Sequence, residues 1–262
     1  MKENINLSEF AMKRFGQNFL KSDYYKRKII QSMPNNDLKV VEIGPGLGDL
    51  TKELLKEKSV IAYEVDKRLC EHLNLEFNES IRQGQLKLRC GDVLEHWEDE
   101  KLIDENYNLI ANLPYYIATT IILKALKDDR CKSILVMVQK EVALKFSALS
   151  KDRNFSSLSV LTQRVGEAIL CFDVEPEAFI PAPKVTSSVL LIRKNRSESD
   201  KNFENFLKIA FKQPRKKLSK NLAQNFSKDK INEIFNDLDI DHNLRPHEAT
   251  TEIYYHLYKQ LV

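Results

Sequence analysis

The stretch that most constrains the fold is Val41-Glu-Ile-Gly-Pro-Gly-Leu-Gly-Asp-Leu-Thr51, where a hydrophobic run passes through three closely spaced glycines into a helix-like segment. Glycine permits a tight turn there, and a ligand can lie directly against the backbone while the N–H groups of the following helix face it. The same turn is also compatible with a strand–helix connection that binds nothing. The stretch therefore predicts a strand–turn–helix unit, and a ligand site only if other residues agree.

The rest of the first part of the chain repeats this alternation of strand and helix through about residue 190. The expected strands are 39–43, 59–63, 86–89, 107–111 and 133–138, and the expected helices between them include 49–57, 66–78 and 117–127. Strands that alternate with helices pair in parallel through right-handed crossovers, so we expect an α/β fold with a doubly wound, Rossmann-like sheet. Two further β-rich runs, 167–174 and 187–192, have no convincing helix between them and are expected to pair antiparallel at one sheet edge.

The pattern changes after Arg193. The polar stretch 195–201 is typical of a linker. Beyond it, apolar residues at helical spacing predict helices near 203–210, 218–226, 231–238 and 250–262. We therefore expect a larger domain at 1–194 and a small, all-helical C-terminal domain at 195–262.

Composition narrows the class of protein. With 262 residues, 42% of them hydrophobic, the chain can bury a full core without a metal or a disulfide. The four cysteines lie far apart with no C-x-x-C pair, and the N-terminal residues do not read as a secretory signal, which favours a reducing cytoplasm. The five histidines show no zinc-ligand spacing, and no apolar run reaches the roughly 20 residues that span a bilayer, so we expect neither a metal site nor a membrane span.

Two acidic residues at expected strand ends bear on the ligand. Glu64 follows Gly44 by twenty residues, at a position where a carboxylate can accept hydrogen bonds from both ribose hydroxyls. Asp92, in Cys90-Gly-Asp-Val93, can accept a hydrogen bond from an adenine amino group. Alone, the first would be a solvated carboxylate and the second a helix N-cap. Together with the glycines they indicate a nucleoside-containing cofactor.

The spacing of the glycines discriminates between cofactors. It is G-x-G-x-G rather than the G-x-G-x-x-G expected for a pyrophosphate, and the chain has no G-x-x-x-x-G-K-[ST] for a nucleoside triphosphate. S-adenosylmethionine therefore fits better than NAD.

Asn112-Leu-Pro-Tyr115 follows the fourth expected strand, at the edge where open α/β sheets bind ligands. The amino nitrogen of adenine is a poor nucleophile because its lone pair is delocalised into the ring. Asn112 and the Leu113 carbonyl can each accept a hydrogen bond from that amino group, Pro114 can hold the carbonyl in place, and Tyr115 can stack on the base. An isolated N-x-P-Y is more often a turn with a buried tyrosine, but after a cofactor loop it indicates transfer of a methyl group to adenine.

These motifs resemble those of the rRNA adenine N6-dimethyltransferase family over essentially the whole chain. Arg14-Phe-Gly-Gln-Asn-Phe-Leu20 looks like the first motif of that family, and Phe179–Val185 matches the segment whose phenylalanine sandwiches the target base, which implies that Phe179 faces Tyr115. The resemblance implies that Asn112–Tyr115 is the catalytic tetrapeptide. The cofactor-binding residues that it implies are Gln17, Asn18, Leu20, Gly44, Gly46, Glu64, Asp92, Val93 and Asn112.

Within the family, Ala210–Leu222 and Arg245-Pro246 resemble the housekeeping branch that modifies small-subunit rRNA. That likeness implies a monomer that dimethylates two adjacent adenosines in the 3′-terminal hairpin loop of 16S rRNA, in an assembling 30S subunit. Pro214 departs from the branch, which usually has a second basic residue there, and we expect it to start a helix.

Basic residues in the tail are candidates for RNA contact, because clustered lysines and arginines neutralise phosphates. The cluster is Arg215, Lys216, Lys217 and Lys220. A solvated helix face explains such a cluster equally well. Three rival functions also stay open: a large-subunit rRNA dimethylase, an adenine-N6 DNA methyltransferase, and a ribosome assembly or transcription factor that keeps the fold as a binding platform.

Overall fold

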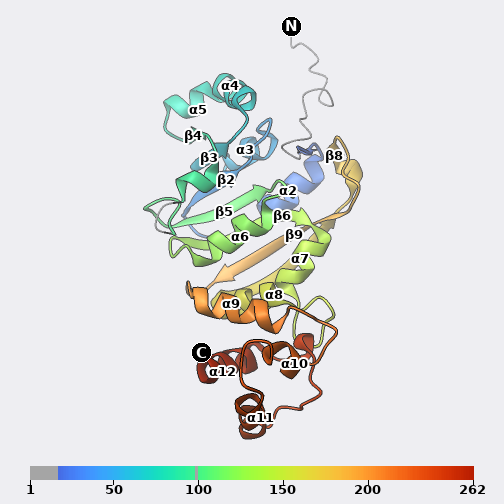
Figure 1. Cartoon of the computed structure of the whole chain (residues 1–262). Helices are drawn as coiled ribbons and strands as arrows, with labels where there is room; N and C mark the ends of the chain where they lie inside the picture. The colour runs from blue at the N-terminus through green and yellow to red at the C-terminus, as the bar shows by residue number, and fades with distance from the viewer. Residues whose placement is uncertain (1–16, 98–99) are drawn as a thin grey trace. The chain divides into compact units, whose positions relative to one another are not determined.

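The computed structural model describes residues 17–97 and 100–262. The chain divides into two compact units (Figure 1). One contains the residues up to Ala143 together with Ile169–Ser197, and the other contains Leu144–Ala168 together with Glu198–Val262. We call them the sheet unit and the helical unit.

A seven-stranded sheet forms the centre of the sheet unit, in the order β4-β3-β2-β5-β6-β9-β7. Its strands are β2 (Lys39–Ile43), β3 (Val60–Glu64), β4 (Leu86–Cys90), β5 (Tyr107–Asn112), β6 (Cys131–Gln139), β7 (Gly166–Val174) and β9 (Ser187–Lys194). The strands β2 to β6 pair in parallel, and β9 pairs antiparallel with β6. The predicted doubly wound sheet is confirmed, with the two late β-rich runs adjacent at one edge.

The central strands are mostly hydrophobic because helices cover the sheet. Every residue of β3 is buried, as are the last four residues of β2. The helices of the sheet unit are α2 (Asp23–Gln31), α3 (Asp49–Leu54), α4 (Lys67–Glu76), α5 (Asn78–Arg82) and α6 (Ala118–Lys127). In Figure 1, α6 crosses the region of β5 and β6, and it buries Ala118, Ile121, Ile122, Ala125 and Leu126.

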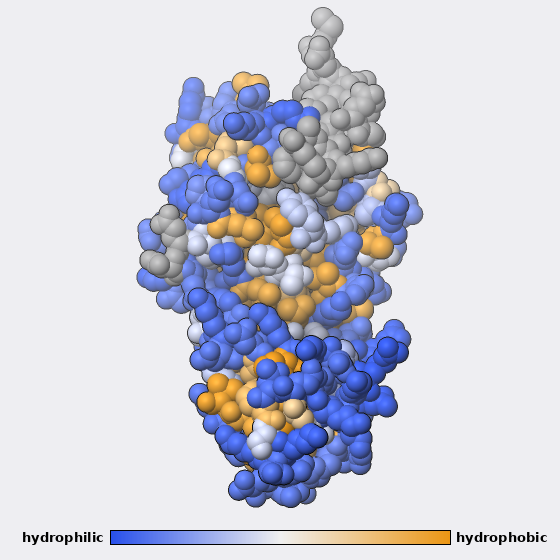
Figure 2. All heavy atoms as spheres, viewed as in Figure 1, coloured by the Kyte–Doolittle hydropathy of each residue, from blue (hydrophilic) through white to orange (hydrophobic). Residues whose placement is uncertain are grey.

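Shorter elements complete this unit. They are the 3-10 turns η2 (Val93–His96) and η3 (Pro176–Ala178) and a small antiparallel pair of β1 (Phe19–Leu20) with β8 (Phe179–Ile180). On the face drawn in Figure 2, hydrophobic residues gather over the middle of the sheet unit and are bordered by hydrophilic ones.

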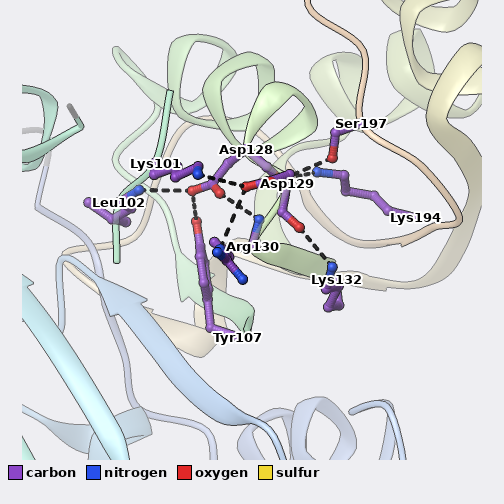
Figure 3. A network of polar contacts seen from close by, with 9 residues as sticks. All are labelled: Lys101, Leu102, Tyr107, Asp128, Asp129, Arg130, Lys132, Lys194 and Ser197. Carbon is purple, nitrogen blue, oxygen red and sulfur yellow. Dashed lines mark hydrogen bonds and ion pairs between the residues drawn. The ribbon is translucent and has the colours of Figure 1, made fainter. Parts of the chain in front are cut away.

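The amino ends of β5 and β6 are held by a polar network around Asp128, which directly follows α6 (Figure 3). The fully buried carboxylate of Asp128 accepts hydrogen bonds from the Tyr107 hydroxyl at 2.7 Å, the Leu102 amide at 2.9 Å and the Arg130 amide at 2.8 Å. Nζ of Lys194 donates to the main-chain carbonyl of Asp128 at 2.6 Å. The end of β9 is thereby tied to the same edge of the sheet, because β9 runs antiparallel to β6.

The helical unit contains the four predicted tail helices, observed as α9 (Lys201–Ala210), α10 (Leu218–Leu222), α11 (Lys228–Asp237) and α12 (Thr251–Leu261), with the 3-10 turn η4 (Pro246–Glu248). It also contains α8 (Ser157–Val165), and α7 (Lys140–Ser147) runs across the division between the units. Phe155 and Val160 pack in one core cluster with Phe203, Phe235 and Tyr254. Apolar packing therefore groups residues 144–168 with the tail, although their order in sequence suggested the larger domain.

Two expectations from the sequence are wrong. Pro214 does not start a helix: α10 begins at Leu218, because the side chain of Asn221 holds the backbone of Gln213 in a turn through bonds of 3.0 and 3.1 Å. The cysteines are not all separate thiols, because Cys70 and Cys90 form a disulfide. Their separation of 20 residues concealed that the sheet brings α4 beside β4.

Candidate active site

A cleft at the carboxyl edge of the sheet contains all the residues predicted to bind the cofactor or to carry the chemistry, and its open volume, solvent at its mouth included, is about 1070 Å³. The predicted residues that line it are Gln17, Asn18, Leu20, Gly44, Gly46, Glu64, Asp92, Val93, Asn112, Leu113, Pro114 and Tyr115. The ends of β2, β3, β4 and β5 meet at this edge because those strands are parallel.

The glycine loop between β2 and α3 leaves bare backbone in the cleft. Gly46 has φ 62° and Gly48 has φ 83°, conformations that glycine adopts without strain. A side chain at Gly48 would also run into the ring of Phe77. The Gly46 N–H donates to Oε2 of Glu64 at 3.2 Å, so the loop and the end of β3 are joined directly.

Glu64 is a buried carboxylate that lines the cleft, only 4% exposed. Its Oε1 accepts the Asp66 amide at 2.9 Å. Burial raises the pKa of Glu64, and the hydrogen bonds from Asp66 and Gly46 partly offset the rise. The acid can accept further hydrogen bonds from a ligand, and hydroxyl groups are donors that suit it.

A second buried acid lines the cleft, Glu42, which was not predicted from the sequence. It is 1% exposed, and its Oε2 accepts a hydrogen bond from the Thr51 hydroxyl at 2.7 Å. Burial raises the pKa of Glu42 to about 8, the Thr51 bond lowers it, and the charge of Glu64 raises it further. An acidic residue inside the apolar run Val40–Ile43 was the available signal. A ligand that carries positive charge would favour the ionised form of Glu42, against the effect of burial.

The tetrapeptide Asn112–Tyr115 is fixed by its neighbours. Nδ2 of Asn112 donates to the Asn18 carbonyl at 3.0 Å, and the Leu113 amide donates to the Met137 carbonyl at 3.1 Å. The Tyr115 hydroxyl lies 2.7 Å from Oγ of Ser187. Within residues 17–97 and 100–262, neither Oδ1 of Asn112 nor the Leu113 carbonyl accepts a hydrogen bond, so two acceptors stay open in the cleft.

Two other predicted residues, Asp92 and Phe179, differ in part from what the sequence predicted. Asp92 lines the cleft, and its Oδ1 caps η2 by accepting the Leu94 amide at 2.9 Å, so the N-cap role is observed, while the contact with an adenine amino group stays a prediction. Phe179 is 3% exposed, pairs with Leu20 between β8 and β1, and is not among the residues that line the cleft. Instead the cleft has an exposed aromatic side chain next to Tyr115 in sequence, Tyr116, which is 59% exposed and was not predicted from the sequence.

The predicted RNA-contact residues lie in the helical unit, around the start of α10. Arg215, Lys216, Lys217 and Lys220 are all exposed. Nζ of Lys217 donates to the side chain of Asn243 at 2.6 Å.

Two other kinds of feature are absent from the part of the chain that the structure describes. No group of three or more His, Cys, Asp or Glu side chains could hold a metal ion there. No described helix has the length and the apolar character needed to cross a membrane.

Comparison with known proteins gives a consistent result. The family model described as "Ribosomal RNA adenine dimethylase" matches residues 9–261. The chain is 56% identical over 249 residues to ribosomal RNA small subunit methyltransferase A of Sulfurimonas denitrificans, covering 95% of this chain and 93% of the relative. It is 54% identical to the protein of the same name from Aliarcobacter butzleri, covering 96% of each.

Two solved structures share the fold at low identity. A dimethyladenosine transferase from Plasmodium falciparum has a TM-score of 0.78 at 23% identity, covering 92% of this chain and 98% of its own. The 23S rRNA methyltransferase ErmE has a TM-score of 0.70 at 21% identity, covering 93% and 99%. The match of the family model over nearly the whole chain, together with relatives that are more than half identical, shows that this methyltransferase belongs to the ribosomal RNA adenine dimethylase family.

Proposed function

We propose that the chain transfers methyl groups from S-adenosylmethionine to N6 of two adjacent adenosines in the 3′-terminal hairpin loop of 16S rRNA, during assembly of the small subunit. The observation that carries the proposal is that the glycine loop, Glu64 and Asn112–Tyr115 line one cleft. The relatives named small subunit methyltransferase A support the choice of substrate. An extruded base costs least in a loop, which supports a hairpin loop over a duplex.

The residues of the cleft fit the cofactor in both shape and charge. Glu64 would accept the ribose hydroxyls, Asp92 the adenine amino group, and the bare backbone at Gly44 and Gly46 would lie against the nucleoside. A positively charged ligand beside Glu42 would lower its raised pKa and favour the ionised form of this buried acid. When bound, S-adenosylmethionine supplies a methyl group on a positively charged sulfur.

Asn112 and Leu113 would activate the amine. Their two open acceptors, aimed at the two N6 protons, draw the nitrogen toward tetrahedral geometry and turn its lone pair toward the methyl group. The bond to the Asn18 carbonyl fixes the Asn112 amide, so Oδ1 stays in place while the reaction proceeds. The surplus proton of N6 leaves to water after transfer. Alignment of this kind supplies on the order of 7–11 kcal/mol.

Tyr115 would hold the target base by stacking, with its ring fixed through the contact to Ser187. Stacking of this kind contributes roughly 1–3 kcal/mol per base. A role for Phe179 opposite Tyr115 requires the Phe179 side chain to leave the core in which it is buried. We therefore assign the stacking in the first place to Tyr115.

The helical C-terminal part would contribute rRNA contacts. Its exposed cations Arg215, Lys216, Lys217 and Lys220 are suited to phosphates, and binding through them would weaken as salt rises. The substrate is consistent with the cytoplasmic location expected from the sequence, and with a protein that acts as a monomer.

Transfer of labelled methyl groups tests this function. We expect incorporation into 30S particles that lack the modification and none into 50S particles or duplex DNA, and mass spectrometry of the rRNA should place the label on two adjacent adenosines. Label in 50S particles would favour a large-subunit enzyme, and label in duplex DNA a DNA methyltransferase. Tight binding to 30S particles without transfer would favour an assembly factor.

A further inference from the structure

The disulfide between Cys70 and Cys90 joins two elements that form one wall of the cleft. Cys90 is the last residue of β4 and is paired in register with Glu64 of β3. Cys70 lies in the first turns of α4, where its amide donates to the carbonyl of Asp66, the N-cap residue. The Cα atoms of the two cysteines are 6.1 Å apart.

Each cysteine is a direct neighbour in sequence of a residue that lines the cleft. Leu69 precedes Cys70, Gly91 follows Cys90, and both line the cleft. The Gly91 amide also donates to the Glu64 carbonyl at 2.8 Å. The disulfide therefore fixes the end of β4, which leads to Asp92, relative to the segment that follows Glu64.

The two cysteine residues differ in exposure to solvent. Cys70 is 4% exposed, whereas Cys90 is an exposed residue. Exposed disulfides are the labile ones, and in cytoplasmic proteins a disulfide is usually transient, catalytic or redox-sensing rather than structural. The protein family and its proposed rRNA substrate place this bond in such a compartment.

We infer that Cys70 and Cys90 form a reversible thiol–disulfide site that exchanges with low-molecular-weight thiols and disulfides and sets the affinity of the cleft for its nucleoside cofactor. The effect on affinity rests on the proposed function. The site itself rests on the position of the two cysteines.

The exchange is balanced as two successive displacements. The Cys90 thiolate attacks one sulfur of oxidised glutathione and releases one glutathione thiolate. The Cys70 thiolate then attacks Sγ of Cys90, which forms the Cys70–Cys90 bond and releases the second. Two cysteine thiols are oxidised, one disulfide is reduced, and the released thiolates take up the protons that the attacking thiols lost.

The oxidised form is the one that binds cofactor more tightly. With the disulfide formed, the Glu64 and Asp92 sides of the cleft are already held in the positions seen here. A ligand that contacts both sides then loses less conformational freedom on binding. In the reduced form the end of β4 lacks a covalent link to α4 and is held by the hydrogen bonds of the sheet and by the contact of Arg89 with Tyr63.

The full-length chain is equilibrated in buffers of reduced and oxidised glutathione, and the state of each cysteine is read by alkylation and mass spectrometry. The affinity for S-adenosylhomocysteine is then measured by calorimetry in both states. We expect the oxidised chain to bind at least about fivefold more tightly. Cys90→Ser, at the exposed position, should bind like the reduced chain in every buffer, and Cys171→Ser, which removes a free cysteine, should behave like the wild type.

Three results would overturn the inference: a pair that stays reduced in excess oxidised glutathione, a pair that resists reduced glutathione in the folded chain, or equal affinity in the two states. Cys70→Ser removes the same disulfide from the other side and should also bind S-adenosylhomocysteine like the reduced chain. A chain that binds no S-adenosylhomocysteine in either state contradicts the proposed function and with it the effect on affinity, while the mass spectra still report on the exchange itself.

Discussion

The two edges of the sheet use polar residues in opposite ways. At the amino edge, the Asp128 carboxylate accepts three hydrogen bonds from the chain itself. At the carboxyl edge, Asn112 and Leu113 each leave an acceptor open within the described residues, and Glu42 is a buried acid that no cation of the described chain pairs with. The polar groups of the amino edge find their partners within the chain, whereas those of the carboxyl edge find theirs only when a ligand binds.

The strand β5 connects the two edges and shows both uses of a polar residue. β5 begins at the buried network and ends in the cleft, and it has an asparagine near each end. Asn108 is 2% exposed, and its amide contacts Asn36 at 2.8 Å and Ser133 at 2.7 Å. Asn112 uses only its Nδ2 within the described chain. The same residue type therefore stabilises the fold at one end and is available to substrate at the other.

The largest effect should come from removing the buried acceptor at the amino edge. Asp128→Ala leaves the Leu102 and Arg130 amides and the Tyr107 hydroxyl without their acceptor, and we expect a loss of about 3–5 kcal/mol in the free energy of unfolding. Denaturant unfolding followed by Trp97, the one tryptophan of the chain, measures it in the sheet unit. Methyl transfer by the fraction that stays folded should be unchanged.

Asp129→Ala is the matched control for that variant. The Asp129 side chain is 57% exposed, and its contacts to Lys101 and Arg130 are 4.0 and 3.9 Å. We expect a loss of about 0–1 kcal/mol. Equal losses in the two variants would contradict the view that the buried acceptor holds this edge together.

The second effect falls on activity. Asn112→Ala removes one of the two proposed acceptors for N6, and we expect kcat to fall about 10²–10³-fold while the fold is kept. Asn108→Ala should do the reverse: a loss of about 1–3 kcal/mol in stability with kcat unchanged, because the buried Ser133 hydroxyl loses its acceptor and the half-buried Asn36 loses a donor. Single-turnover methyl transfer and denaturant unfolding, measured on both variants, decide it. An unchanged kcat in Asn112→Ala would remove the proposed catalytic role.

How much of each edge the sequence predicted follows the same division. The carboxyl edge was predictable, since its glycines, Glu64, Asp92 and Asn112–Tyr115 sit at fixed distances from strand ends and their residue types suit a ligand. Asp128 was not singled out, because it lies at the end of a helix and its partners come from three other segments. Glu42 was missed for a related reason: a buried acid in an apolar strand has meaning only once the cleft is known. The placement of residues 144–168 depends on packing with helices far along the chain, which periodicity does not report.

The third effect is a dependence of stability on pH at the carboxyl edge. Because burial raises the pKa of Glu42 to about 8 from an ordinary 4.5, the folded chain keeps a proton that the unfolded chain has lost between these values. The contribution of this retained proton to the free energy of unfolding is fully present below about pH 4.5. It is lost as pH rises toward 8, at up to about 1.4 kcal/mol per pH unit.

Glu42→Gln should flatten this dependence, since its amide stays neutral and can still accept from Thr51. Between pH 5.5 and 7.5 the wild type should lose roughly 2–3 kcal/mol more than the variant, measured by denaturant unfolding at each pH. Glu57→Gln, which changes an exposed carboxyl nearby in sequence, should follow the wild type. A wild-type slope in Glu42→Gln would show that Glu42 is ionised in the folded chain.

The smallest effect separates the ring of Tyr115 from its hydroxyl. Tyr115→Ala removes the proposed stacking surface. We expect kcat/KM to fall by an amount that corresponds to a loss of about 1–3 kcal/mol in transition-state stabilisation. Tyr115→Phe keeps the ring and removes only the contact to Ser187, so its effect should stay near 0.5–1.5 kcal/mol, and Ser187→Ala should match it. If Tyr115→Phe lowered kcat/KM as much as Tyr115→Ala, the hydroxyl rather than the ring would be the functional group. The carboxyl edge would then act through hydrogen bonds alone, as the amino edge does. Aromatic stacking would no longer distinguish the two edges.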